Sequence, residues 1–173
     1  SPSMSINFIK NFLSDFYREF PHINYELYEV PIDEQTQQLL EGKTEIGIAN
    51  APLKQSKRFE TLFSRKERLV ALFHKDSPYL KNDKSNILLD DLEDIPLCLS
   101  RGCSELFFSV CSDSHIFPQV MSINTTKLSA IAWAEKNTGV AIVPAPAVEL
   151  FPANLVRKEI KDERLFLEMT LSI

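Results

Sequence analysis

The chain alternates strand-like and helix-like segments in two successive series. Apolar runs such as EIGIAN (45–50) and VAIVP (140–144) have the length of buried strands, and amphipathic segments of helical period stand between runs of this kind. A strand, a helix and a second strand form a β-α-β unit, whose connection is right-handed when the strands are parallel. The alternation, made twice along the chain, therefore predicts an α/β protein.

The first series opens with an apolar helix pattern in which a phenylalanine recurs every four residues. Proline, aspartate and glycine then mark where elements stop and start. The expected elements are a helix over residues 5–20 stopped by Pro21, a half-buried strand over 23–30, a helix capped by Asp33 and closed by Gly42, a strand over 45–50, and extended runs over 58–64 and 67–74.

The second series repeats the alternation with a different set of caps. Asn124, Thr125 and Thr126 offer oxygens that can cap a helix, and Asn137 or Gly139 can end it because both tolerate the left-handed backbone. The expected elements are a helical turn near 89–94, strands over 96–100 and 117–123, helices over 104–113 and from 127, a strand over 140–144, a helical turn over 146–150, and closing strands over 155–160 and 165–173.

Length and charge exclude several classes of protein. The 173 residues are enough for one domain or two small lobes, and the formal net charge of −5 gives no basic surface for nucleic acid. We therefore do not expect this chain alone to bind DNA. It contains neither an apolar run of about 20 residues nor an export signal, so for an untrimmed chain we expect a cytoplasmic location and no membrane partner.

The three cysteines are odd in number and lack a Cys-x-x-Cys spacing, which indicates reduced thiols. Cys103 stands at the start of a predicted helix, where the helix dipole would lower the pKa of its thiol and make it reactive. The alternative is a small buried thiol without a chemical role, and the sequence favours this alternative because no resolving partner is evident.

Metal and catalytic chemistry have little support in the sequence. No histidine has a carboxylate or cysteine at metal-ligand spacing, so we expect no metal site and no cofactor. A nucleophile–base pair, a P-loop and a GxGxxG fingerprint are not found, so we do not expect an enzyme. The histidines concerned are His22, His74 and His115.

Five stretches carry a resemblance to a known family. In order and spacing, the chain resembles the effector-binding domain of LysR-type transcriptional regulators. Its most specific pieces are Phe20-Pro21 before a strand, the segment Leu39 to Ile48, and the strand Gly139 to Pro144. The stretches are FIKNFLSDFYREFPHINYELYE, LLEGKTEIGIAN, ERLVALFHKDSPYL, LDDLEDIPL and LSAIAWAEKNTGVAIVPAPAV.

The resemblance implies two Rossmann-like lobes joined by two crossover segments, similar to type 2 periplasmic binding proteins. Lobe I is expected at residues 1–73 plus 164–173 and lobe II at 74–163. The family also implies a DNA-binding winged helix-turn-helix, which is not in this chain, and subunit pairing through the first helix. Here Ile9, Leu13 and Phe16 would form the dimer surface, unless they only pack within the lobe.

The sequence departs from the family pattern in a few places. Asn137 and Thr138 replace the usual glycine and apolar residue, and Glu45 replaces the usual aspartate. The family's strand before the first helix and its usual helix after the last strand are not seen. We therefore expect that the chain is an excised domain, or a set of ordered residues with missing pieces closed up.

Ligands of α/β lobes bind at the carboxyl ends of strands, near helix N-termini, where free N–H groups converge. In the family, loops at these places face each other across the cleft between the lobes and bind a small effector, which is often anionic. Each residue can also be read as an ordinary helix cap. The candidate effector-binding residues are Ser1, Ser3, Asn50, Ser100, Arg101, Asn124, Thr125 and Pro144.

Arg101 is the one cation among these candidates. Its guanidinium could hold a carboxylate with two parallel hydrogen bonds, or it could pair with Glu105 on the protein surface.

The resemblance thus predicts the effector-sensing regulatory domain of a bacterial LysR-type transcriptional regulator, which forms a dimer, or a tetramer at full length. A free-standing solute-binding protein of the same bilobal fold is the alternative. An enzyme on this scaffold is a third possibility, in which Cys103 or Arg101 would have to be catalytic. The sequence names neither the effector nor the target genes.

Overall fold

The structure, a computed structural model, describes residues 13–50, 56–81, 83, 85–145 and 149–173. It divides into two compact units, which we call unit 1 (residues 1–65 and 168–173) and unit 2 (residues 66–167). The chain passes between the units twice, once within β2 (Thr61–His74) and once within β8 (Phe166–Ser172). The predicted α/β fold with two lobes and two crossings is confirmed, and the predicted lobe limits stay a prediction.

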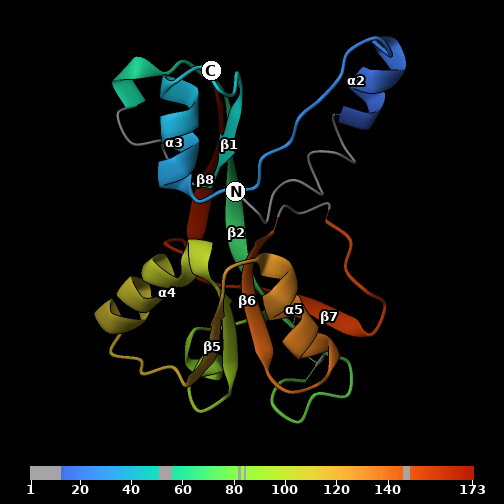
Figure 1. Cartoon of the computed structure of the whole chain (residues 1–173). Coiled ribbons are helices and arrows are strands. Elements are labelled where there is room, and N and C mark those ends of the chain that lie inside the picture. Colours follow the sequence, from blue (N-terminus) through green and yellow to red (C-terminus); the bar gives the residue numbers. More distant parts are fainter. Residues whose placement is uncertain (1–12, 51–55, 82, 84, 146–148) are drawn as a thin grey trace. The chain divides into compact units, whose positions relative to one another are not determined.

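Unit 1 is built on a short strand covered by a helix. The strand β1 (Gly47–Ala49) pairs antiparallel with β8, so that Ile48 lies opposite Leu171. The helix α3 (Ile32–Leu40) packs on β1 (Figure 1). The Gln35 side chain of α3 donates a hydrogen bond of 3.0 Å to the carbonyl of Ile48. The unit also contains α2 (Ser14–Glu19) and a short 3-10 helix at Ser56–Arg58.

The helices of unit 1 end just before the proline and glycine residues predicted to stop them, but one predicted N-terminal cap is wrong. Helix α2 ends at Glu19, directly before Phe20-Pro21, as predicted. Gly42 has φ +67, which confirms the left-handed residue expected after α3. Asp33 does not cap α3: it lies inside the first turn, where its charge still favours the positive end of the helix.

The predicted strand over residues 23–30 is wrong. This segment contains no described strand, and Leu27 and Tyr28 are exposed. Alternation of apolar side chains indicates which side of an extended segment can be buried, but a strand also needs a backbone partner for its N–H and C=O groups. In the part of the chain that the structure describes, no strand pairs with these residues.

Unit 2 contains most of the regular structure. The two extended runs predicted on either side of residue 65 form one strand, β2, because no turn residues separate them. The remaining elements are β3 (Asn86–Ile87), a 3-10 turn (Asp90–Leu92), β4 (Leu97–Ser100), α4 (Arg101–Asp113), β5 (Val120–Asn124), α5 (Lys127–Glu135), β6 (Val140–Ala145) and β7 (Leu155–Ile160).

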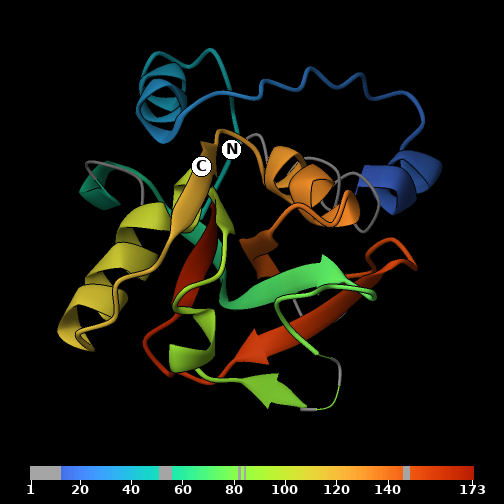
Figure 2. The ribbon, with the colours of Figure 1, turned by 90° about the horizontal axis from the view of Figure 1, so that it is seen from below.

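The sheet of unit 2 is mixed. β4 lies between β5 and β6 and is parallel to both, whereas β2 is antiparallel to β6 and to β7, and β3 is parallel to β7. Helices α4 and α5 cover opposite faces of this sheet (Figure 2). Under α4 the core includes Phe107 and Leu99, and under α5 it includes Ala130 and Val143.

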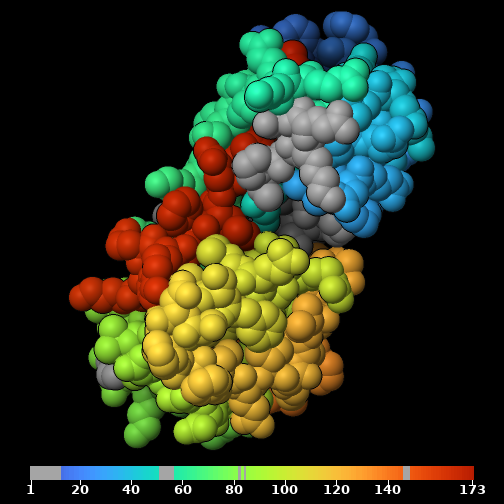
Figure 3. All heavy atoms as spheres, turned by 90° about the vertical axis from the view of Figure 1, so that its left-hand side faces the viewer, coloured from blue at the N-terminus to red at the C-terminus, as the bar shows by residue number. Residues whose placement is uncertain are grey.

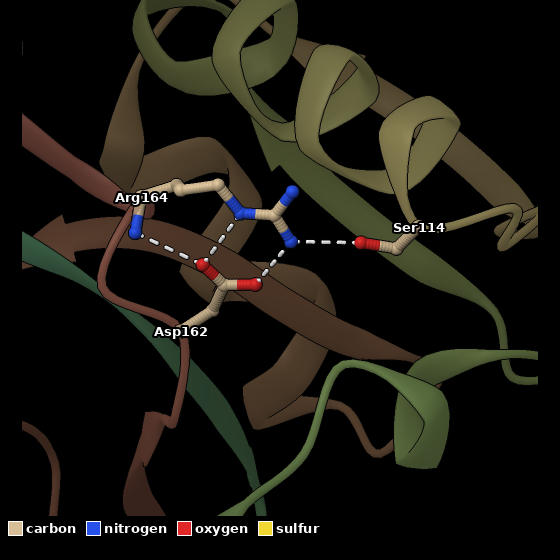
Figure 4. A network of polar contacts seen from close by, with 3 residues as sticks. All are labelled: Ser114, Asp162 and Arg164. Atoms are coloured by element: carbon tan, nitrogen blue, oxygen red, sulfur yellow. Dashed lines mark hydrogen bonds and ion pairs between the residues drawn. The ribbon is translucent and has the colours of Figure 1, made fainter.

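The outer face of α4 lies on the surface of unit 2, where Figure 3 shows it in yellow. The C-terminal end of this helix is tied to the turn between β7 and β8. Arg164 donates to both carboxylate oxygens of Asp162 and to the hydroxyl of Ser114, which caps the end of α4 (Figure 4). The hydrogen bonds from Arg164 hold the pKa of the Asp162 carboxyl below its usual range.

Candidate functional site

The candidate residues of unit 2 lie at the ends of three neighbouring parallel strands. Ser100 is the last residue of β4 and lies opposite Asn124, the last residue of β5. Pro144 is the last residue but one of β6, which pairs with the other side of β4. Because parallel strands end at the same edge of a sheet, these three residues share one edge, where α4 and α5 begin.

Ser100 has a buried side chain, exposed by only 2%. Its hydroxyl lies 3.2 Å from the thiol of Cys103, and it makes no cap hydrogen bond to α4. The expected serine cap is therefore absent here, and the first N–H groups of α4 keep their capacity to bind an acceptor.

The prediction that the helix dipole lowers the pKa of Cys103 is wrong. Burial raises the pKa of this thiol to about 11, because desolvation disfavours the thiolate more than its hydrogen bonds with Ser100 stabilise it. The thiol also donates to the carbonyl of Ile142 in the core. The structure thus supports the alternative reading, a buried thiol without nucleophilic character.

Arg101 is exposed at the first position of α4. The alternative reading of Arg101, a surface pair with Glu105, is not observed, and no residue that the structure describes makes a hydrogen bond or ion pair with its guanidinium. This cation is therefore available to an anion at the strand ends.

Asn124 is anchored on both sides. Its amide group donates to the carbonyl of Leu99 at 3.2 Å, and its side-chain oxygen accepts from the indole of Trp133 on α5 at 3.3 Å. Thr125 is exposed, and Thr126 caps α5 by accepting from the N–H of Ser129 at 3.1 Å. The residue that caps α5 is thus Thr126 and not Thr125.

Asn50 is the described candidate of unit 1. It directly follows β1 and is partly buried. Its side-chain oxygen is buried and has no hydrogen-bond partner among the residues that the structure describes, which is costly unless a further group binds there. Ser1 and Ser3 lie outside the described residues.

One polar pair at the same edge of unit 2 was missed by sequence reasoning. The ammonium of Lys127, the first residue of α5, lies 2.7 Å and 2.8 Å from the two carboxylate oxygens of Glu149 and also donates to the carbonyl of Pro144 at 3.3 Å. A signal was present, because a lysine in the first turn of a helix opposes the helix dipole and calls for a nearby carboxylate.

Metal-ligating clusters of three or more histidine, cysteine, aspartate or glutamate residues are not found among the described residues. A search of the same residues finds no helix with the length and apolar character needed to cross a membrane.

Comparison with known proteins gives a family for the chain. Residues 1–172 match the family model described as "LysR substrate binding domain".

Two curated relatives are transcriptional regulators. "HTH-type transcriptional regulator AlsR" of Bacillus subtilis (strain 168) is 23% identical over 98% of this chain and 57% of its own length. "HTH-type transcriptional regulator BenM" of Acinetobacter baylyi (strain ATCC 33305 / BD413 / ADP1) is 27% identical over 81% of this chain and 48% of its own length. The chain thus spans about half the length of these relatives.

Solved structures share the fold. The BenM effector-binding domain with its effector benzoate has a TM-score of 0.79 at 20% identity, covering 98% of this chain and 78% of that one. The effector-binding domain of QuiR in complex with shikimate has a TM-score of 0.77 at 16% identity, covering 98% and 82%. CbnR, a LysR family transcriptional regulator, has a TM-score of 0.76 at 18% identity, covering 93% and 56%.

Proposed function

Because the chain belongs to the LysR substrate-binding domain family, we propose that it is the effector-sensing regulatory domain of a bacterial LysR-type DNA-binding transcriptional regulator. The match of the family model to residues 1–172 carries this proposal. The two curated relatives, which are named as regulators with a helix-turn-helix, support it.

The proposed site lies between the two lobes and takes a small effector. Its unit 2 side consists of the strand ends at Ser100, Asn124 and Pro144 together with Arg101 and Thr125. Asn50 contributes from unit 1, and Ser1 and Ser3 are assigned to the same site from the family resemblance. The Asn50 oxygen and the Arg101 guanidinium, which have no partner within the described part of the chain, are the groups that a polar ligand would satisfy.

The effector class that fits these groups is a small molecule with an anionic group. Arg101 offers a guanidinium beside the start of α4, where backbone N–H groups also favour negative charge. The BenM effector-binding domain was solved with benzoate and that of QuiR with shikimate. Carboxylic acids of this size are the first compounds to examine with the present chain.

The mechanism that follows is differential binding. An effector that contacts both lobes favours the conformation in which those contacts form together, and it shifts the conformational equilibrium only by its difference in affinity between the two states. Catalysis has no part in this scheme, and no cofactor is assigned.

The full-length protein would bind DNA through a domain that is not in this chain, and it would act as a dimer or tetramer in the cytoplasm. Phe16 on α2 is 45% exposed and belongs to the proposed dimer surface, as does Leu13; Ile9 lies outside the described residues. The alternative, a free-standing solute-binding protein, shares the fold but has no support among the curated relatives, which are regulators.

A thermal-shift screen tests the proposed function. The full chain is heated with millimolar benzoate, shikimate and other small carboxylates, with the corresponding amides and alcohols as uncharged controls. A binding acid raises the Tm with a dependence on concentration, since a ligand of the native state stabilises by RT ln(1 + [L]/Kd). A Tm increase with uncharged compounds alone would contradict the proposal that the effector is anionic. A broad screen in which no compound raises the Tm would contradict the proposed effector-sensing function.

A further inference from the structure

The pair of Lys127 and Glu149 is among the most buried charged contacts of the described residues, and its two side chains are exposed by 6% and 9%. One ammonium donates to three oxygens, two on Glu149 and one on the backbone of Pro144. The contact joins three places in the chain: the first residue of α5, the end of β6, and the segment that follows β6.

Stability alone does not account for this pair. Taking two charges out of water costs several kcal/mol per ion, and replacing a buried ion pair by apolar residues of similar volume is often neutral or stabilising. Lys127 also stands at the positive end of the α5 dipole, where a cation is disfavoured. What the pair provides beyond an apolar contact is a fixed geometry, because three hydrogen bonds hold one ammonium in one place.

The pair fixes the edge of the unit 2 sheet at which β4, β5 and β6 end. Lys127 follows Asn124, Thr125 and Thr126, and the carbonyl that accepts its hydrogen bond belongs to Pro144. Asn124 is held from the other side by the Trp133 indole and by its bond to Leu99. The start of α5 is therefore anchored both to β4 and to the end of β6.

The same contacts determine what Lys127 does not do. Its ammonium is already neutralised by Glu149 and is nearly inaccessible to solvent. It does not compete with the exposed guanidinium of Arg101 for an anion at this edge.

We propose that Lys127 and Glu149 are positioning residues, which lock the start of α5 onto the end of β6 and so hold Asn124 and Thr125 in the arrangement that binds the effector. This inference rests on the proposed function for the identity of the site. The locking itself is a property of the unliganded chain.

Hydrogen exchange in the full chain, measured without any effector, tests the locking. The variant Lys127→Met with Glu149→Leu keeps the volume of the pair and removes its charges and hydrogen bonds. We expect its Tm to stay close to that of the wild type, while the amides of residues 129–131 in α5 and of Val143 and Ala145 in β6 exchange roughly tenfold faster or more. The amides of α4 serve as the internal reference and should not change.

The exposed pair of Arg68 and Glu163 provides the matched control, since the variant Arg68→Gln with Glu163→Gln removes the same charges from the surface of unit 2. Wild-type exchange at α5 and β6 in the Lys127 and Glu149 variant would overturn the proposal. Faster exchange throughout unit 2 with a lowered Tm would overturn it too, because the pair would then be a general stabiliser. A failed thermal-shift screen would reject the effector site while leaving this result standing.

Discussion

Ser100 and Asn124 lie opposite each other as the last residues of two parallel strands, and both side chains are engaged in the fold. The Ser100 hydroxyl contacts a buried thiol, and the Asn124 amide bridges β4 to α5. Two predicted ligand contacts thus also shape the edge of the sheet on which a ligand would bind. Their replacement would alter the site through its geometry as well as through lost contacts.

Arg101 is the residue whose replacement should weaken an anionic ligand with the least structural damage. We expect Arg101→Ala to cost about 1–3 kcal/mol of binding free energy for a carboxylate found in the thermal-shift screen. Isothermal titration calorimetry measures this loss. Arg101→Lys keeps the charge and should lose less. An unchanged affinity in Arg101→Ala would remove this residue from the site, and the Tm of the free variant should equal that of the wild type.

Gly139 and Gly102 form a matched pair of glycines. A Cβ at Gly139 would lie 2.7 Å from the carbonyl oxygen of Pro96 and 3.2 Å from the Cys98 sulfur, whereas a Cβ at Gly102 meets nothing within 4 Å. We therefore expect Gly139→Ala to destabilise by about 1–3 kcal/mol, because a backbone clash forces a shift of β4 or β6. Gly102→Ala should be neutral or slightly stabilising. Urea denaturation of both variants decides, and equal midpoints would contradict the close packing at Gly139.

Because the Cys103 thiol is buried, the free energy of unfolding should fall as the pH rises above about 9. Burial raises the pKa of this thiol to about 11, well above the ordinary value for a cysteine, so the unfolded state loses its thiol proton first as the pH rises. The stabilising contribution is complete below about pH 9 and is lost as the pH approaches 11, amounting to about 2–3 kcal/mol at most. The measurement is the difference in unfolding free energy between wild type and Cys103→Ala from pH 8 to pH 11. A constant difference would show that the thiol is not desolvated.

Asp162 should stabilise the fold above, and not below, its titration range. Its pKa is lowered by hydrogen bonds from Arg164, so the contribution is present above the unfolded pKa near 4 and is lost as the pH falls through the lower folded value. Because the pair is partly exposed, we expect Asp162→Asn to cost about 1 kcal/mol or less at pH 7. Thermal melts of this variant and the wild type should converge at low pH. Ser114→Ala serves as the control that keeps the ion pair and should retain the acid dependence.

The elements of unit 2 were predictable because local signals agreed with their packing. Thr126 caps α5 as one of the three proposed residues, and Asn137 follows its end in a left-handed conformation with φ 57. Strand β6 is buried along its whole length, as an uninterrupted apolar run indicates. In each case, a residue type with a narrow conformational preference stands at the boundary.

The errors came from interactions between distant segments. Residues 23–30 alternate like a strand but lack a described pairing partner, and pairing is not encoded in one segment alone. The pKa of Cys103 depends on how deeply it is buried, which its place in the sequence does not reveal. The Lys127–Glu149 contact joins residues 22 positions apart, so it could be found only once β6 and α5 were placed in one unit.

All three cysteines of the chain are buried, at Cys98, Cys103 and Cys111. Maleimide reagents should therefore leave the native protein unlabelled at neutral pH, and a single cysteine introduced at an exposed position such as Ser112 would carry a fluorophore or spin label alone. The domain is ready for distance measurements between two such labels without first replacing its own thiols.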